Sequence, residues 1–319
     1  MSRLSIIIPV YYNEENLEDL YEDISLKVIP KIPDYEIVMV DDGSGDNSWE
    51  IMNRIRMKDP GHVKCVKLSR NFGEHAALLA GFSTCTGDCA VTKQADLQED
   101  SALIPEMYES WKKGNDVVLA VRRSRVDSAG EKVAAGAYYK IVNRFITKNM
   151  PEEGTDCYLI DRKVIEVLKK FDEKNSSLTL QVLWAGFQTD KVYFDRQGRE
   201  KGKGRWTLAK KFKLAADSLL SFSYLPIRLM TWMGVIFDIL AVLMIIEVFL
   251  EYFTVGVPVK GWSMLTCIVL FTAGVIMFML GIIGEYLWRT LDATRNRPPF
   301  IIDEIKTGES ETDRTKERG

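Results

Sequence analysis

"YEIVMVDDGSGDNS", residues 35–48, changes character halfway along its length. Its first half is a run of apolar residues with the length of a buried strand. Two carboxylates, Asp41 and Asp42, and a glycine follow at once, and residues 49–58 then have helical periodicity. A buried strand that ends in polar groups and leads into a helix predicts one unit of a parallel α/β sheet.

The same pattern recurs along the first 122 residues. Apolar runs of strand length occupy 4–10, 63–69, 89–95 and 116–122, and helical periods separate most of them. Such alternation predicts a mostly parallel sheet covered by helices on both faces, with ligands at the carboxyl ends of the strands. No GxGxxG motif follows any of these runs, which argues against a dinucleotide-binding dehydrogenase.

Composition narrows the classes of function. The 319 residues carry a formal net charge of -3, and only two of them are histidines. The five cysteines form no CxxC pair, which argues against a zinc site or a disulfide framework and favours a reducing compartment. Residues 191–213 contain nine Lys or Arg against two acids, a block suited to nucleic acid, anionic lipid or phosphate-bearing substrates.

Two stretches are apolar enough to cross a bilayer, residues 229–250 and 263–284. Each supplies about 20 residues at helical rise, which matches a hydrocarbon layer of roughly 30 Å. Basic residues flank the outer ends of the pair, whereas the loop between them offers only Lys260, so both outer ends are expected in the cytoplasm. Residues 206–228 place apolar side chains at helical spacing among lysines and predict interfacial helices.

Polar side chains at the strand ends are the candidates for chemistry. Asp41 and Asp42 suit hydrogen bonds to a base or ribose, although a role in the turn remains open for Asp42. Asp96 and Gln98 follow the fourth strand and offer the oxygen ligands that Mg²⁺ or Mn²⁺ takes when it also binds a diphosphate. Asp100 is better placed to cap the helix that is expected from Leu103.

The chain is similar to a known family in the order of six motifs. These are "PVYYNEENL", "VDDGSGDNS", "LSRNFGEHAALLAGF", "QADLQED", "WAGF" and the basic run before two spans. It resembles the family 2 glycosyltransferases of GT-A fold, and among them the polyprenyl-phosphate glycosyltransferases related to GtrB and dolichol-phosphate mannose synthase. The similarity extends to about residue 300. It implies transfer of a hexose, with inversion, from a nucleotide sugar to undecaprenyl or a similar polyprenyl phosphate.

The resemblance gives the chain an expected organisation. Its fold is α/β, a Rossmann-like GT-A domain with a mostly parallel sheet, joined to interfacial helices and two transmembrane helices. The predicted parts are a cytosolic domain over 1–205, interfacial helices over 206–228, transmembrane helices over 229–250 and 263–284, and a cytosolic tail over 285–319. We expect the polar segment after Asp303 to lack regular structure.

The family pattern also implies a set of nucleotide-sugar-binding residues. The first loop matches at Pro9, Tyr11 and Glu14, with Asn13 an alternative to Glu14, and Asp41 matches the residue that holds the nucleoside. The family's Asp-Ala-Asp-Leu-Gln stands here as residues 94–98, so Gln94 and Ala95 precede the metal-facing Asp96. Gln94 brings no charge where the family has an aspartate, which predicts weaker metal binding or an altered nucleotide contact. The expected nucleotide-sugar-binding residues are Pro9, Tyr11, Glu14, Asp41, Asp42, Gln94, Ala95 and Arg122.

Three further residues complete the expected catalytic group with Asp96. Asp156 matches an acidic position near the acceptor, where it would position the acceptor, the sugar or the metal, unless it only caps the next helix. Arg199 and Arg205 match basic positions of a mobile loop that contacts the diphosphate and the lipid phosphate. Guanidinium groups suit this role because two phosphate-bearing substrates repel each other.

Two other interpretations remain. A processive polysaccharide synthase would carry a Gln-x-x-Arg-Trp motif and more spans, whereas Gly202 stands at the Gln position here. A non-enzymatic nucleotide-sugar-binding or scaffold protein is suggested by Gln94. UDP-glucose is the first choice of donor, with other UDP-sugars and GDP-mannose behind it. We expect a multi-pass inner-membrane protein with both termini cytoplasmic, a homo-oligomer with no nucleic-acid partner.

Overall fold

The computed structural model describes residues 2–123, 154–155, 157–171, 177–195, 261–295 and 297–308, with isolated positions between 140 and 151 and between 230 and 254. The chain divides into two compact units, which are Met1–Ala215 together with Pro298–Gly319, and Ala216–Arg297. The end of the chain therefore returns to the first unit after the second one. The predicted domain boundaries, which assign 285–319 to a separate tail, stay predictions.

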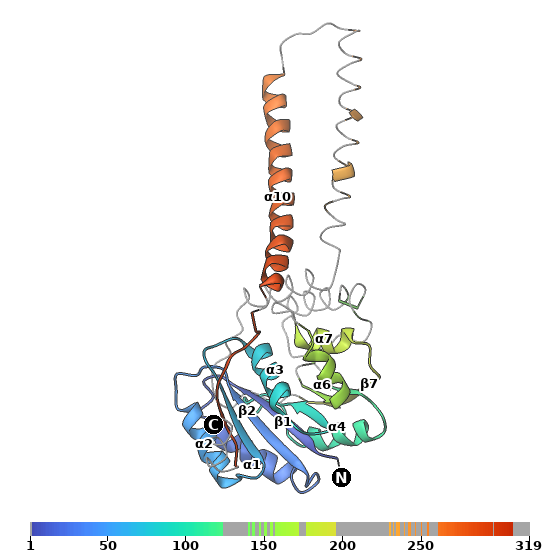
Figure 1. The fold of residues 1–319 in the computed structure, drawn as a ribbon. Coiled ribbons are helices and arrows are strands. Elements are labelled where there is room, and N and C mark those ends of the chain that lie inside the picture. Colours follow the sequence, from blue (N-terminus) through green and yellow to red (C-terminus); the bar gives the residue numbers. More distant parts are fainter. Residues whose placement is uncertain are drawn as a thin grey trace. The chain divides into compact units, whose positions relative to one another are not determined.

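The elements of the first unit alternate as expected over the N-terminal half (Figure 1). The strands are β1 (Leu4–Val10), β2 (Tyr35–Asp41), β3 (Val63–Leu68), β4 (Cys89–Thr92), β5 (Val117–Arg122), β6 (Tyr158–Asp161), β7 (Thr189–Phe194) and β8 (Ile302–Lys306). The helices are α1 (Leu17–Lys27), α2 (Ser48–Lys58), α3 (Glu74–Thr84), α4 (Leu103–Lys112), α6 (Arg162–Leu168) and α7 (Leu178–Trp184).

The eight strands form one sheet in the order β7-β5-β6-β4-β1-β2-β3-β8. β1 pairs in parallel with both β2 and β4, β2 with β3, and β5 with β7, which confirms the prediction of an α/β fold with a mostly parallel sheet. β6 runs antiparallel to β4 and β5, and β8 runs antiparallel to β3. The sheet is therefore mixed at these two places.

Helices cover both faces of the sheet, as the continuous apolar strands require. Alternate residues of β1 point to opposite faces, so Ile6 and Ile8 pack with α1, α2 and α4, whereas Ile7 packs with α3, α6 and α7. All seven residues of β1 and of β2 are buried. A strand buried on both faces has no polar alternation, which explains why these two strands were recognisable in the sequence.

The expectation that the segment after Asp303 lacks regular structure is wrong for its first residues. Ile302–Lys306 form β8, which covers the outer edge of β3 with the register Cys65 to Lys306 and Val66 to Ile305. Ile302 and Ile305 pack against the core on the α3 side of the sheet. Ile302 and Ile305 are three residues apart, and the register shifts between Lys67 and Leu68. The segment therefore lacks the strict alternation of a strand, and the long polar run that follows also hid it in the sequence.

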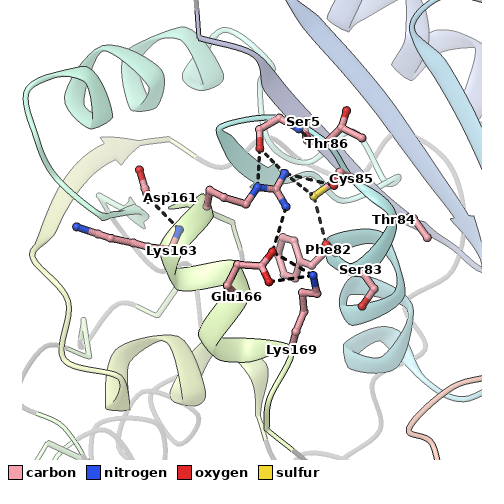
Figure 2. A network of polar contacts seen from close by, with 12 residues as sticks. Ser5, Phe82, Ser83, Thr84, Cys85, Thr86, Asp161, Lys163, Glu166 and Lys169 are labelled. Atoms are coloured by element: carbon pink, nitrogen blue, oxygen red, sulfur yellow. Dashed lines mark hydrogen bonds and ion pairs between the residues drawn. The ribbon is translucent and has the colours of Figure 1, made fainter.

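A polar network closes the edge of the sheet where β1 and β4 begin (Figure 2). Arg162, the first residue of α6, donates from Nε to the Gly87 carbonyl at 2.8 Å and from its guanidinium to the Cys85 carbonyl at 3.3 Å. The buried Glu36 accepts hydrogen bonds from Ser5 Oγ at 2.6 Å and from Gly87 N at 3.0 Å. These contacts hold the turn between α3 and β4. They lie at the end of the sheet opposite the carboxyl ends of β1, β2 and β4.

The second unit contains α10 (Trp262–Thr294), whose segment Gly274–Thr294 is long and apolar enough to cross a membrane and is not buried. The predicted span 263–284 overlaps this segment. Within the unit, Met279 Cε lies 3.9 Å from the point where a Cβ on Gly234 would stand. The first predicted span, 229–250, falls on residues that are described only at isolated positions. Among the described residues, one helix is therefore long and apolar enough to cross a membrane, and the second span stays a prediction.

Candidate functional site

The carboxyl ends of β1, β2 and β4 meet at one edge of the sheet. Parallel pairing sets Val10 opposite Asp41 and Ile7 opposite Thr92. The loops after these three strands therefore leave the sheet side by side, and they contain most of the predicted site residues. β5 runs in the same direction, because it is antiparallel to β6 and β6 is antiparallel to β4, so Arg122 at its end belongs to the same edge.

Asp41 has a buried carboxylate at the end of β2. Its side chain is 0% exposed, and Oδ1 accepts a hydrogen bond from the Ser44 amide at 3.1 Å. Oδ2 is buried and has no hydrogen-bond partner in the described part of the chain. Burial raises the pKa of Asp41, and the Ser44 hydrogen bonds oppose that rise. An unsatisfied buried acceptor of this kind suits a donor group of a ligand, such as an N–H of a nucleobase.

Asp42, the next residue, holds a loop of the protein. Its two carboxylate oxygens accept hydrogen bonds from the amides of Phe72 at 2.7 Å and Gly73 at 2.9 Å. Burial raises its pKa despite these two bonds. The role in a turn that the sequence left open is therefore present, although the loop it holds is the one before α3. Contact between Asp42 and a nucleotide stays a prediction.

The loops after β1 and β2 are joined by several hydrogen bonds. The Tyr12 amide donates to Ser44 Oγ at 3.0 Å, and Glu14 Oε2 accepts from the Asn47 amide at 2.9 Å. Glu14 thus ties one loop to the other, and its predicted contact with the nucleotide would use the remaining carboxylate oxygen. Tyr11 is 38% exposed beside the joined loops, so its ring is accessible to a ligand.

Tyr12, which follows Tyr11 in the loop after β1, has a backbone conformation that the sequence did not indicate. Its φ of 55° lies in the left-handed region, where non-glycine residues are uncommon and strained. Its ring packs edge to face against Tyr11, and a Cβ on Gly45 would stand 2.8 Å from its hydroxyl oxygen. The glycine at 45 is the sequence signal for this close approach.

Gln94 forms a side-chain pair with a residue of α3. Its Nε2 donates to Glu74 Oε1 at 2.6 Å, and both side chains are partly buried. Glu74 is the first residue of α3 and was not among the predicted site residues. The amide at position 94 therefore faces a carboxylate, a combination that an aspartate at position 94 would make repulsive.

Asp96 lies in a tight turn after β4. Its Oδ1 accepts a hydrogen bond from the Gln98 amide at 3.2 Å, and Leu97 between them has a φ of 57°. Asp100 Oδ1 accepts from the Ala102 amide at 2.9 Å just before α4 and pairs with Lys27 at 2.9 Å. The predicted capping of α4 by Asp100 is not confirmed, because the N-cap residue is Ala102 and no side chain caps this helix. The strained Leu97 is typical of a site where the backbone is held for function.

No group of three metal-ligating His, Cys, Asp or Glu side chains gathers among the described residues. Asp96 and Gln98 nevertheless fit a hard divalent cation of the kind that takes one or two protein oxygens and completes its shell with water and substrate phosphates. The donor set is therefore compatible with Mg²⁺ or Mn²⁺ bound together with a diphosphate.

The remaining predicted residues fall into two groups. Pro9 is buried near the end of β1, and Ala95 is buried in the segment that follows β4. Asp156, Arg199 and Arg205 lie outside the described residues, so their roles stay predictions. On either side of position 156, Thr155 donates to the Cys157 carbonyl at 3.0 Å and Cys157 Sγ donates to the Thr92 carbonyl at 2.8 Å.

Comparison with known proteins shows which family the chain resembles. Residues 5–169 match the family model Glycosyl transferase family 2. The chain is 35% identical over 303 residues to an uncharacterized glycosyltransferase of Synechocystis, with 95% of each chain covered. It is 32% identical over 305 residues to the prophage bactoprenol glucosyl transferase homolog of Escherichia coli, with 95% of this chain and 99% of the relative covered.

Among solved structures, a mannosyltransferase from Pyrobaculum calidifontis in complex with GDP-Man and Mn²⁺ is 19% identical, with a TM-score of 0.46 over 64% of this chain and 58% of that one. The matched family model and the relatives named as glycosyltransferases define the chain as a glycosyltransferase. The chain belongs to glycosyl transferase family 2.

Proposed function

We propose that this glycosyltransferase moves a hexose, with inversion, from a nucleotide sugar to a polyprenyl phosphate at the cytoplasmic leaflet of the inner membrane. The observation that carries the proposal is the match over 95% of the chain to a relative named as a bactoprenol glucosyl transferase homolog, since bactoprenol is a polyprenol. An apolar helix in the same chain supports a lipid acceptor, because such an acceptor stays in the membrane.

The described residues suggest how the donor binds. Asp41 Oδ2 would accept a hydrogen bond from the nucleobase, and the exposed ring of Tyr11 would lie against the nucleoside. Asp96 and Gln98, which follow β4 on the other side of β1, would then bind the diphosphate. Arg122, which ends β5 at the same edge, is a further candidate for the donor phosphates.

The transfer itself requires little proton chemistry from the protein. The bond between the anomeric carbon and the diphosphate oxygen breaks as an oxygen of the acceptor phosphate bonds to the opposite face of the sugar. A phosphate oxygen is already ionised at neutral pH, so no strong general base is needed, and we assign Asp156 to positioning the acceptor, the sugar or the metal. Arg199 and Arg205 would hold the two phosphate groups together.

Asp96 and Gln98 would hold Mg²⁺ or Mn²⁺. When bound, such a cation neutralises the charge that develops on the departing nucleoside diphosphate. UDP-glucose is the first donor to test, followed by UDP-N-acetylglucosamine and GDP-mannose. We further propose that residues 229–250 form a second span, so that both termini are cytoplasmic, and that the chains associate through their spans.

The experiment is a radiolabel transfer assay with detergent-purified protein, undecaprenyl phosphate and each nucleotide sugar in the presence of Mg²⁺ or Mn²⁺. We expect one donor to give an organic-extractable, mild-acid-labile product. Nucleotide-sugar binding in a thermal-shift assay without any lipid-linked product would reject the proposed acceptor.

A further inference from the structure

The pair formed by Gln94 and Glu74 carries an inference about donor binding, which rests on the proposed function. The two residues are 20 positions apart and come from different elements, since Gln94 lies just beyond β4 and Glu74 begins α3. Their hydrogen bond of 2.6 Å is a charge-assisted one, because the acceptor is a carboxylate. It therefore connects the α3 loop to the turn that contains Asp96.

Glu74 is held in place by the end of β2. Asp42 binds the amides of Phe72 and Gly73 directly before it, and Gly73 has a φ of 98°, which favours glycine. A carboxylate in the first turn of a helix is also stabilised by the helix dipole. The position of Glu74 is thus set by two partly buried hydrogen bonds and one backbone turn.

A buried tyrosine lies near the Glu74 carboxylate. Tyr158 is 1% exposed on β6, and its hydroxyl has no hydrogen-bond partner in the described part of the chain. Burial, and to a smaller extent the charge of Glu74, raises the pKa of Tyr158. The Glu74 carboxylate, which is only partly exposed, therefore lies close enough to Tyr158 to influence its hydroxyl.

The chemistry of an amide makes this contact directional. Gln94 has one acceptor oxygen and one donor NH₂ group, whereas an ionised Glu74 can only accept. The NH₂ group must therefore face Glu74, and Oε1 is left on the other side of the amide as an acceptor. Without Glu74, the amide could rotate by half a turn and present donors there.

We propose that Glu74 is a positioning residue for the nucleotide-sugar donor, because it orients the Gln94 amide so that Oε1 accepts a hydrogen bond from a hydroxyl of the ribose or the sugar. Gln94 then offers the acceptor that a carboxylate would offer at this position, while the negative charge of the pair resides on Glu74. Neither residue functions at full strength without the other.

The test exchanges the two side chains, which have equal length. In Gln94→Glu, two carboxylates face each other, and we expect the KM for the donor to rise about ten-fold or more, with a smaller change in kcat. In the double variant Glu74→Gln with Gln94→Glu, the hydrogen bond reforms with reversed polarity. We expect its donor KM to return to within about three-fold of the original value.

Glu50→Gln is the matched control, because Glu50 is an exposed acid in the first turn of another helix that follows a strand of the sheet. Alone it should leave the donor KM unchanged, and combined with Gln94→Glu it should give no recovery. Recovery with Glu50→Gln as large as with Glu74→Gln would attribute the effect to net charge and overturn the proposal.

The size of the nucleotide-sugar-induced rise in melting temperature is measured on every variant and should follow the same order as the donor affinities. If the effects of Glu74→Gln and Gln94→Glu combine additively in both measurements, the pair is not coupled and the inference fails, while the proposed function stands.

If the unmodified protein binds nucleotide sugar but transfers nothing, the proposed function fails, and the thermal-shift series still decides the coupling. Should Gln94→Glu not fold, an unchanged donor affinity in folded Glu74→Ala would reject the proposal.

Discussion

Asp41 combines a buried carboxylate with an acceptor oxygen that the described protein leaves unsatisfied. Such a group costs about 1–3 kcal/mol of folding free energy when it stays unpaired. Because its pKa is raised in the fold, stability is lost as the pH rises from the usual carboxyl range through the raised value. A ligand that donates to Oδ2 would offset that cost.

We therefore predict that Asp41→Asn weakens nucleotide-sugar binding about ten-fold or more while the melting temperature at pH 7 stays the same or rises. The asparagine side chain is uncharged and has one acceptor oxygen where aspartate has two. It therefore loses either the acceptor that faces the ligand or the acceptor that binds the Ser44 amide. Isothermal titration and thermal unfolding measure the two quantities. A large fall in melting temperature with unchanged affinity would assign Asp41 to structure alone.

Asp96→Ala should abolish sugar transfer and leave the protein folded. The matched control is Asp100→Ala in the same loop, because Asp100 binds Lys27 and the Ala102 amide. The control should lower the melting temperature and keep transfer. Transfer rates and the thermal shift induced by Mn²⁺ distinguish the two variants, and full activity in Asp96→Ala would remove the proposed metal ligand.

Glu36, near the start of β2, makes the free energy of unfolding depend on pH. Burial opposes its ionisation, but hydrogen bonds from Ser5 and Thr86 and the charge of Lys64 outweigh burial, so its pKa lies below the usual value. Its contribution to stability is therefore present above the pKa of an unfolded glutamate and is lost as the pH falls through the lowered value.

Glu36→Gln should accordingly destabilise the protein by about 1–3 kcal/mol at pH 7. The difference from the unmodified protein should shrink as the pH falls below the usual range of a glutamate and through the lowered pKa of Glu36, because the original carboxyl then becomes protonated as well. Thermal unfolding at several pH values tests this. A difference that does not vary with pH would mean that the contribution of Glu36 is steric.

Among the elements, β8 links the end of the chain to the sheet. It covers β3 with antiparallel hydrogen bonds, and Lys306 lies 5.2 Å from the ring centroid of Trp49 on α2. An uncovered edge strand is both less stable and prone to pairing with other chains. β8 therefore protects the sheet although it follows the apolar helix α10 in the sequence.

Truncation after Phe300 should lower the stability of the first unit by on the order of 3 kcal/mol, because it removes the ladder and two partly buried isoleucines. Truncation after Gly308, which is the last described residue, keeps β8 and should have no such effect. Proteolysis rates and melting temperatures of the two shortened proteins provide the comparison. Equal stability of both would show that β8 does not contribute.

For the whole molecule, chain connectivity joins the first unit to the second at two places, after Ala215 and before Pro298. If the second unit spans the membrane, the first unit is tethered at both points and cannot drift from the lipid surface. This arrangement suits an enzyme whose acceptor is confined to the bilayer.

We predict that the protein stays in the membrane fraction after alkaline washing, and that protease added to intact spheroplasts leaves the first unit uncut. Protease added to inverted vesicles should cut it. The reason is the excess of basic residues outside the two predicted spans. Cleavage in spheroplasts alone would reverse the proposed orientation.

The strands β1 and β2 and the carboxylates at their edge were predictable, because a strand buried on both faces is a continuous apolar run and its end is marked by polar residues. The apolar length of α10 was predictable for the same local reason. β6 and β8 were not, since β6 inserts antiparallel between β4 and β5 and β8 pairs with a strand more than 200 positions away, and local patterns do not reveal such pairings.

The side-chain pairs at the site could not be predicted from local sequence patterns either. Glu74 meets Gln94, and Asp42 meets the loop before α3, only because strand register and helix packing bring separate segments together. Periodicity records which face of an element is buried, and it contains no information about which distant residue lies opposite. That choice depends on tertiary packing, which here makes Glu74 the partner of an amide that the sequence presented as a lone substitution.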